Sequence, residues 1–138
     1  MPLTLTRTVG FRAVHRLYRT DWSEARNRQA FGPLSDPPGH PHDYRCAVTV
    51  SGPVDARMSM VVDLAELDRI LQEEVVARLD GKYLNEDVPE LAGTVPTCEA
   101  IAAAVFRRVG PRLPRGVTLE RVRIMEDPTL YADCTGLD

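Results

Sequence analysis

The sequence predicts an α+β domain in which two helices cover one face of an antiparallel sheet. Four segments show strand signals, chiefly the alternation of apolar and polar residues that half-buried strands have. Two other segments place apolar residues at helical spacing. The order along the chain is strand, strand, helix, helix, strand, with a short extended segment at the end. Strands on either side of a helix pair favour helices packed on one face of an antiparallel sheet.

Size and composition fit one compact domain. The chain has 138 residues, of which 43% are hydrophobic and 27% charged, and its net charge is −3. These are ordinary values for a globular protein, so we treat residues 1–138 as a single domain. A weakly acidic chain lacks the clustered basic field that nucleic-acid binding requires. No apolar run approaches the roughly 18 residues of a membrane span. We therefore expect neither a nucleic acid nor a membrane as a partner.

The cysteines and the N-terminus indicate a cytoplasmic protein. Cys46, Cys98 and Cys134 are far apart and odd in number, which favours neither a disulfide framework nor a cysteine zinc site. The first residues contain no apolar stretch of the kind that a secretory signal has. We therefore expect a reducing, cytoplasmic location.

The first two strands are predicted at residues 3–18 and 40–51. Alternation places His15 on the apolar face of the first strand, and His40 and His42 share one face of the second. Between the strands, residues 19–39 are rich in proline, glycine and charge, which predicts a structured loop.

The helices are predicted from their caps and apolar stripes. Asp63, with Glu66 three residues later, forms a capping-box pattern before a helix that ends near Asp80 and Gly81. After a long connection over residues 82–96, Thr97 starts a second helix. The remaining strands are expected over residues 117–126 and around residues 129–131.

The three histidines of the chain are predicted to converge. If the first two strands pair in antiparallel fashion, the end of the first lies opposite the start of the second, and His15 approaches His40 and His42. Three imidazoles with an open fourth position form a ligand set for catalytic Zn²⁺. On spacing alone, three separate structural histidines explain the pattern equally well.

Other candidate groups are individually ambiguous. Glu126 shares a strand face with apolar residues, where a carboxylate is either paired or functional, although an exposed strand-end acid fits too. Asp80, taken alone, fits a helix C-terminal cap or a solvated loop acid better than a functional acid. Cys98, in the first helical turn, and Cys46, within a strand, fit packing roles better than nucleophilic ones.

Several stretches, in the same order, resemble motifs of the 6-pyruvoyl-tetrahydropterin synthase family, which includes 6-carboxytetrahydropterin synthase. Together they cover nearly the whole chain, and several motifs in register are more specific than any one. The stretches are FRAVHRL (Phe11–Leu17), FGPLSDPPGHPHDY (Phe31–Tyr44), MVVDLAEL (Met60–Leu67), LDGKYLN (Leu79–Asn85), VPTCE (Val95–Glu99) and VRIME (Val122–Glu126).

The resemblance implies a tunnelling fold, β-β-α-α-β-β, whose subunits form an oligomeric barrel as a trimer or a hexamer with the active site between subunits. The three histidines match the family's zinc ligands. Glu126 matches the acid that anchors the pterin ring, and Thr97 and Glu99 match a motif that lines its pocket.

Two proton-transfer groups of the family are absent. The family's cysteine falls at Leu34 or, in the bacterial register, at Asp36, and the histidine of its Leu-Asp-His motif falls at Gly81. Asp80 is kept, and Asp43 replaces an asparagine next to the last zinc ligand. The resemblance therefore leaves Asp36, Asp43 and Asp80 as candidate catalytic acids.

These departures favour a divergent zinc-dependent lyase or cyclase. It would act on a carbonyl-bearing, heterocyclic intermediate of specialised metabolism, for example in an amine–aldehyde condensation. One alternative is a pterin synthase or aldolase that acts on dihydroneopterin triphosphate, with an acid in place of the cysteine. Another is an inactive, zinc-stabilised oligomer that binds pterins or serves as a scaffold.

Overall fold

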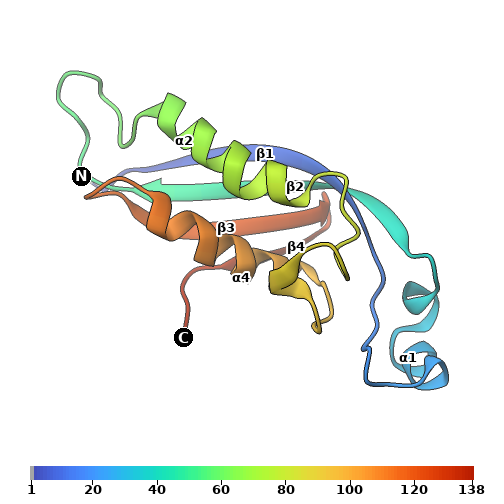
Figure 1. Cartoon of the computed structure of the whole chain (residues 1–138). Coiled ribbons are helices and arrows are strands. Elements are labelled where there is room, and N and C mark those ends of the chain that lie inside the picture. Colours follow the sequence, from blue (N-terminus) through green and yellow to red (C-terminus); the bar gives the residue numbers. More distant parts are fainter. Residues whose placement is uncertain (1) are drawn as a thin grey trace.

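The computed structural model describes residues 2–138 and contains one antiparallel sheet of four strands in the order β1-β2-β3-β4. Two helical segments lie side by side across one face of this sheet (Figure 1). The predicted α+β class and the arrangement of helices on one face are therefore confirmed. The strands are β1 (Thr4–His15), β2 (His40–Ser51), β3 (Thr118–Asp127) and β4 (Leu130–Cys134).

The helices on the sheet begin at the predicted caps. The Asp63 carboxylate accepts hydrogen bonds from the backbone N–H groups of Ala65 and Glu66, and the Thr97 hydroxyl accepts one from that of Ala100. These bonds satisfy donors that a helix start leaves free. The first helical segment runs through α2 (Leu64–Leu71), a π-helical turn (Gln72–Val76) and α3 (Ala77–Leu79), and the second is α4 (Cys98–Val109).

The segment predicted as a loop, residues 19–39, contains a further helix. Helix α1 (Glu24–Phe31) lies beyond one end of the sheet and leads into a 3₁₀ turn, Gly32–Ser35 (Figure 1). The side chain of Asn27 holds it in place, accepting from the backbone N–H of Arg19 and donating to the Arg19 carbonyl. Because Asn27 is the one buried residue of α1, the helix has no apolar stripe for periodicity to detect.

Strand β1 ends at His15, three residues earlier than predicted. The backbone N–H of Arg16 donates to the Asn85 side chain, and that of Leu17 donates to the Leu34 carbonyl. These bonds replace sheet pairing and turn the chain toward α1. They also fix the 3₁₀ turn beside the end of β1.

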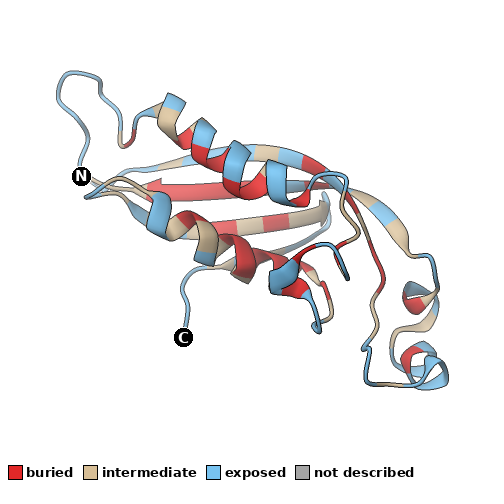
Figure 2. Cartoon of the chain, in the orientation of Figure 1, coloured by how far each residue is buried: buried red, intermediate tan, exposed pale blue. Residues whose placement is uncertain are grey.

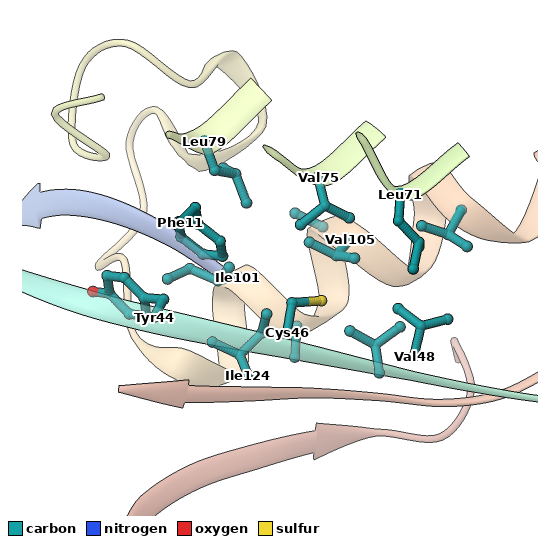
Figure 3. Packing of buried hydrophobic residues seen from close by; sticks show 14 of the residues in the cluster. Phe11, Tyr44, Cys46, Val48, Leu71, Val75, Leu79, Ile101, Val105 and Ile124 are labelled. Atoms are coloured by element: carbon teal, nitrogen blue, oxygen red, sulfur yellow. The ribbon is translucent and has the colours of Figure 1, made fainter. Parts of the chain in front are cut away.

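The core fills the space between the sheet and the helices. Figure 2 shows the buried positions along the sheet-facing sides of the helices, and Figure 3 shows side chains from both layers in contact. Full burial of such a side chain stabilises the fold by about 2 kcal/mol. Cys46 is fully buried among them, as expected of a packing residue. The labelled members are Phe11, Tyr44, Cys46, Val48, Leu71, Val75, Leu79, Ile101, Val105 and Ile124.

Among the residues that the structure describes, no helix covers the opposite face of the sheet (Figure 1). Within residues 2–138 the outer edge of β4 has no neighbouring strand. Free edges favour pairing between subunits. None of the helices in these residues is both long enough and apolar enough to span a membrane.

Candidate metal centre and the pocket beside it

The pairing of β1 with β2 brings the three histidines together. His15 lies directly opposite His40 in the antiparallel register, and His42 projects from the same face two residues further on. One ring nitrogen from each histidine lies within 4.8 Å of the others. The predicted convergence is confirmed.

The hydrogen bonds of His15 leave one nitrogen free to bind a metal. Its Nδ1 lies 2.8 Å from the carbonyl oxygen of Pro96, which can only accept, so Nδ1 carries the proton and Nε2 has the lone pair. The Nε2 atoms of His15 and His42 are buried and have no hydrogen-bond partner. Burying a polar atom without a partner costs free energy, and a bound metal ion would supply the missing partner. A histidine that binds a metal through one ring nitrogen commonly donates a hydrogen bond from the other, as Nδ1 of His15 does to Pro96. The site therefore fits Zn²⁺.

Burial favours the neutral form of His15 and His40. It lowers the pKa of His15 to about 4, with smaller contributions from the two neighbouring histidines. Burial and His42 also lower the pKa of His40. The neutral imidazole is the form that binds metal ions, so the lowered pKa values of His15 and His40 favour the ligand form at neutral pH.

We expect the metal-free protein to lose stability as the pH falls from 6.5 to about 4. His15 titrates near 4 in the folded state and near 6.5 when unfolded, so the unfolded chain binds more protons between these values. The stability that neutral His15 contributes is complete above pH 6.5 and declines below it, by at most about 3 kcal/mol. Urea unfolding with a chelator at pH 7 and pH 4.5 measures this. His15→Asn should flatten the pH dependence, and an equally steep loss in that variant would contradict the assignment.

Glu126, near the end of β3, lies against the same cluster. Its Oε1 is 3.4 Å from Nε2 of both His15 and His42. These contacts lack hydrogen-bond geometry, so the two nitrogens stay without partners. The carboxylate is 17% exposed and faces a pocket of about 200 Å³.

The start of α4 forms the polar wall of this pocket. Thr97 and Glu99 line it together with the histidines and Glu126, so the structure brings the three predicted substrate-binding residues to the predicted metal ligands. Cys98, which the sequence favoured as a packing residue, lines it as well. Burial, with the charges of Glu126 and Glu99, raises the pKa of the Cys98 thiol to about 11. This group is therefore a neutral thiol at pH 7.

Three leucines form the apolar wall, namely Leu17, Leu34 and Leu130. Leu34 and Leu130 are 47% and 50% exposed in the single chain. The sequence resemblance places the family's cysteine at either Leu34 or Asp36, and of these two residues only Leu34 lines the pocket. The 3₁₀ turn Gly32–Ser35 contains Leu34 and places it at the pocket. The sequence motifs alone left the choice between Leu34 and Asp36 open.

The three predicted catalytic acids lie outside this pocket. Asp36 forms an ion pair with Arg28, and Asp43 pairs with Arg12 at 2.9 Å. An Asp80 carboxylate oxygen accepts a hydrogen bond from the backbone N–H of Arg12. Asp43 and Asp80 line a separate surface depression. None of the three lines the histidine pocket of one chain, so a catalytic role for them stays a prediction that would involve a second subunit.

Comparisons with known proteins agree with this geometry. The family model described as 6-pyruvoyl tetrahydropterin synthase matches residues 4–136. The chain is 38% identical over 122 residues to 6-pyruvoyl tetrahydrobiopterin synthase of Homo sapiens, covering 88% of this chain and 83% of the relative. It is 36% identical over 124 residues to the Drosophila melanogaster protein of that name, covering 90% and 74%. The solved structure of Caenorhabditis elegans 6-pyruvoyl tetrahydropterin synthase superposes with a TM-score of 0.92 at 30% identity, covering 99% of this chain and 97% of that one.

Proposed function

The chain belongs to the 6-pyruvoyl tetrahydropterin synthase family, a family of enzymes, and we propose that it is a metal-dependent lyase that acts on the side chain of a pterin. One observation carries the proposal. Three histidines whose ring nitrogens converge, two of them with a buried Nε2 that has no hydrogen-bond partner, share a single pocket with Glu126 and the start of α4. A lyase reaction on a pterin side chain needs a metal ion that polarises a substrate oxygen and, beside it, a carboxylate that accepts hydrogen bonds from the pterin ring.

His15, His40 and His42 would hold the metal, which we take to be Zn²⁺ because three neutral imidazoles suit it. When bound, the ion supplies Lewis acidity that polarises a substrate oxygen. His15 is oriented for this by the Pro96 carbonyl. That bond fixes the ring and keeps the proton on Nδ1.

Glu126 would hold the pterin ring. A carboxylate has two acceptor oxygens, and the ring presents an N–H and an amino group on one edge, so the two can pair in bidentate fashion. The Thr97 hydroxyl already accepts from the backbone N–H of Ala100. Its remaining O–H is available to donate to a ring acceptor.

The proton carriers inside the pocket are Glu99, Glu126 and Cys98. Leu34, at the family's cysteine position, cannot move a proton, and neither can Gly81. Asp80 would serve only a pocket of another subunit, which fits the expected trimer or hexamer with sites between subunits. Asp36 and Asp43 would likewise act only across such an interface.

The relatives favour a pterin over the unrelated carbonyl substrate that the missing residues first indicated. The Homo sapiens and Drosophila melanogaster relatives are both named 6-pyruvoyl tetrahydrobiopterin synthase, and Glu126, Thr97 and Glu99 lie together in one pocket with the metal ligands. A pterin substrate therefore takes precedence over an amine–aldehyde condensation of another heterocycle.

Incubation with reduced pterins tests the proposal. Zinc-loaded protein is mixed with a set of 6-hydroxyalkyl dihydropterins, phosphorylated and not, and the products are read by mass spectrometry. Loss or rearrangement of a side chain, absent after chelation, is the expected result. Binding of a pterin without turnover of any would support the inactive pterin-binding oligomer instead. Absence of both binding and turnover would contradict a pterin site altogether.

A further inference from the structure

We infer that Tyr44 is a positioning residue of the metal centre, which holds the rings of His15 and His42 in the orientation in which they bind the ion. The inference rests on the metal site of the proposed function, because the role exists only if these histidines are ligands. Tyr44 follows His42 by two residues in β2 and is 1% exposed. Its contacts with both histidines lie within one chain, so they do not depend on a second subunit.

Strand parity and a stacking contact bring the Tyr44 side chain to the histidines. Positions 40, 42 and 44 of β2 alternate with exposed positions and share one face of the strand. Phe11 is the cross-strand partner of Tyr44, and the two rings stack with centroids 5.0 Å apart at an interplanar angle of 11°. Figure 3 shows this pair, with the Tyr44 hydroxyl turned away from the aliphatic core. Stacking on Phe11 therefore fixes the direction of the hydroxyl.

The Tyr44 hydroxyl contacts the nitrogen of His15 that does not face the metal site. Its oxygen lies 3.3 Å from Nδ1, whose proton is donated to the Pro96 carbonyl at 2.8 Å. The Tyr44 oxygen is therefore a second, more distant acceptor of the same proton, in a three-centre hydrogen bond. Acceptors on this N–H fix the ring and raise the basicity of the other nitrogen. Both effects favour metal binding by Nε2.

The Tyr44 ring also packs against His42. The two centroids are 5.5 Å apart at an interplanar angle of 74°, an edge-to-face arrangement that aromatic pairs favour. Nε2 of His42 has no hydrogen-bond partner within residues 2–138, so packing by neighbouring rings decides where this nitrogen points. The rings of His15 and His40 also lie beside it, but both are expected ligands themselves. Tyr44 supports His42 from outside the ligand set.

Tyr44→Phe tests the hydroxyl, because it keeps the ring and its stacking on Phe11. We expect zinc affinity, measured by competition with a chromophoric chelator, to fall at least about fivefold. Loss of an orienting partner typically costs about 10- to 100-fold, and the Pro96 carbonyl still accepts from His15 here. The urea midpoint of the metal-free protein should not fall, because the lost contact is the longer arm of a shared bond. A purely structural role would give the opposite pair of results.

Tyr44→Leu tests the ring, and Tyr131→Phe is the control. Tyr44→Leu should reduce zinc affinity further and change the visible spectrum of the Co²⁺-substituted protein, which reports coordination geometry. This variant also leaves a cavity in the core, so Tyr44→Phe decides the inference if Tyr44→Leu fails to fold. The Tyr131 ring lies against the Arg123 guanidinium rather than against the histidines. Removal of its hydroxyl should leave zinc affinity unchanged.

The outcomes separate the inference from the function on which it rests. If Tyr44→Phe binds zinc as tightly as the unmodified protein does, the inference is wrong while the metal centre stands. A lower urea midpoint with unchanged zinc affinity would make Tyr44 a core residue only. If the unmodified protein takes up no zinc, the metal centre is rejected, and the inference with it. No pterin enters these measurements, so a failure to turn over pterins would leave the inference intact.

Discussion

Replacing His42 with alanine should leave the protein without bound metal. The substitution removes one of the three imidazoles whose nitrogens converge within 4.8 Å, and the two that remain cannot complete a tetrahedral site. Loss of a group that merely orients a ligand costs roughly 10- to 100-fold in metal affinity, so loss of a ligand itself should cost more than about 100-fold. Mass spectrometry of the metal content after dialysis against zinc measures the effect.

Asp43→Ala is the matched control for this variant. Asp43 is the next residue in β2, and its side chain is 81% exposed and paired with Arg12. Its removal should leave one zinc ion per chain, because the carboxylate does not line the histidine pocket. Full zinc occupancy in His42→Ala would show that His42 is not a ligand.

Replacing Glu126 with glutamine should weaken pterin binding more than tenfold, which corresponds to about 1.4 kcal/mol. Glutamine keeps the size of the side chain but exchanges one acceptor oxygen for an NH₂ donor, which cannot pair with an N–H of the ring. Calorimetry with 6-methylpterin on the zinc-loaded variant measures the affinity. Metal content should stay unchanged, because the three histidines are intact.

Glu120→Gln provides the comparison on the same strand. The Glu120 carboxylate accepts a hydrogen bond from the Ser51 hydroxyl, away from the pocket, so this variant should bind the pterin as the unmodified protein does. Equal affinities of Glu126→Gln and Glu120→Gln would remove the ring-holding role from Glu126.

The metal cluster could be predicted because it depends on local rules. Strand parity places His40 and His42 on one face, and antiparallel pairing of neighbouring strands brings His15 opposite His40, as the register shows. The helix starts follow from the side-chain chemistry of Asp63 and Thr97. These signals lie within a few residues of each other or in adjacent strands.

The apolar wall of the pocket and the positions of the three predicted acids could not be predicted, because tertiary contacts place them. Helix α1 is held by the buried amide of Asn27 rather than by an apolar stripe. The 3₁₀ turn that follows aims Leu34 at the pocket and leaves Asp36 paired with Arg28. Asp80 is bound to the backbone of β1 by an interaction 68 residues apart in sequence, which no local pattern contains.

Diffraction at the zinc absorption edge, from crystals of zinc-loaded protein grown with 6-methylpterin, tests the central claim most directly. The account predicts one anomalous peak per chain, bound by His15, His40 and His42, and a pterin ring whose N–H edge contacts the Glu126 carboxylate in the same pocket. A zinc ion bound elsewhere, or a pterin that does not contact Glu126, would contradict the account.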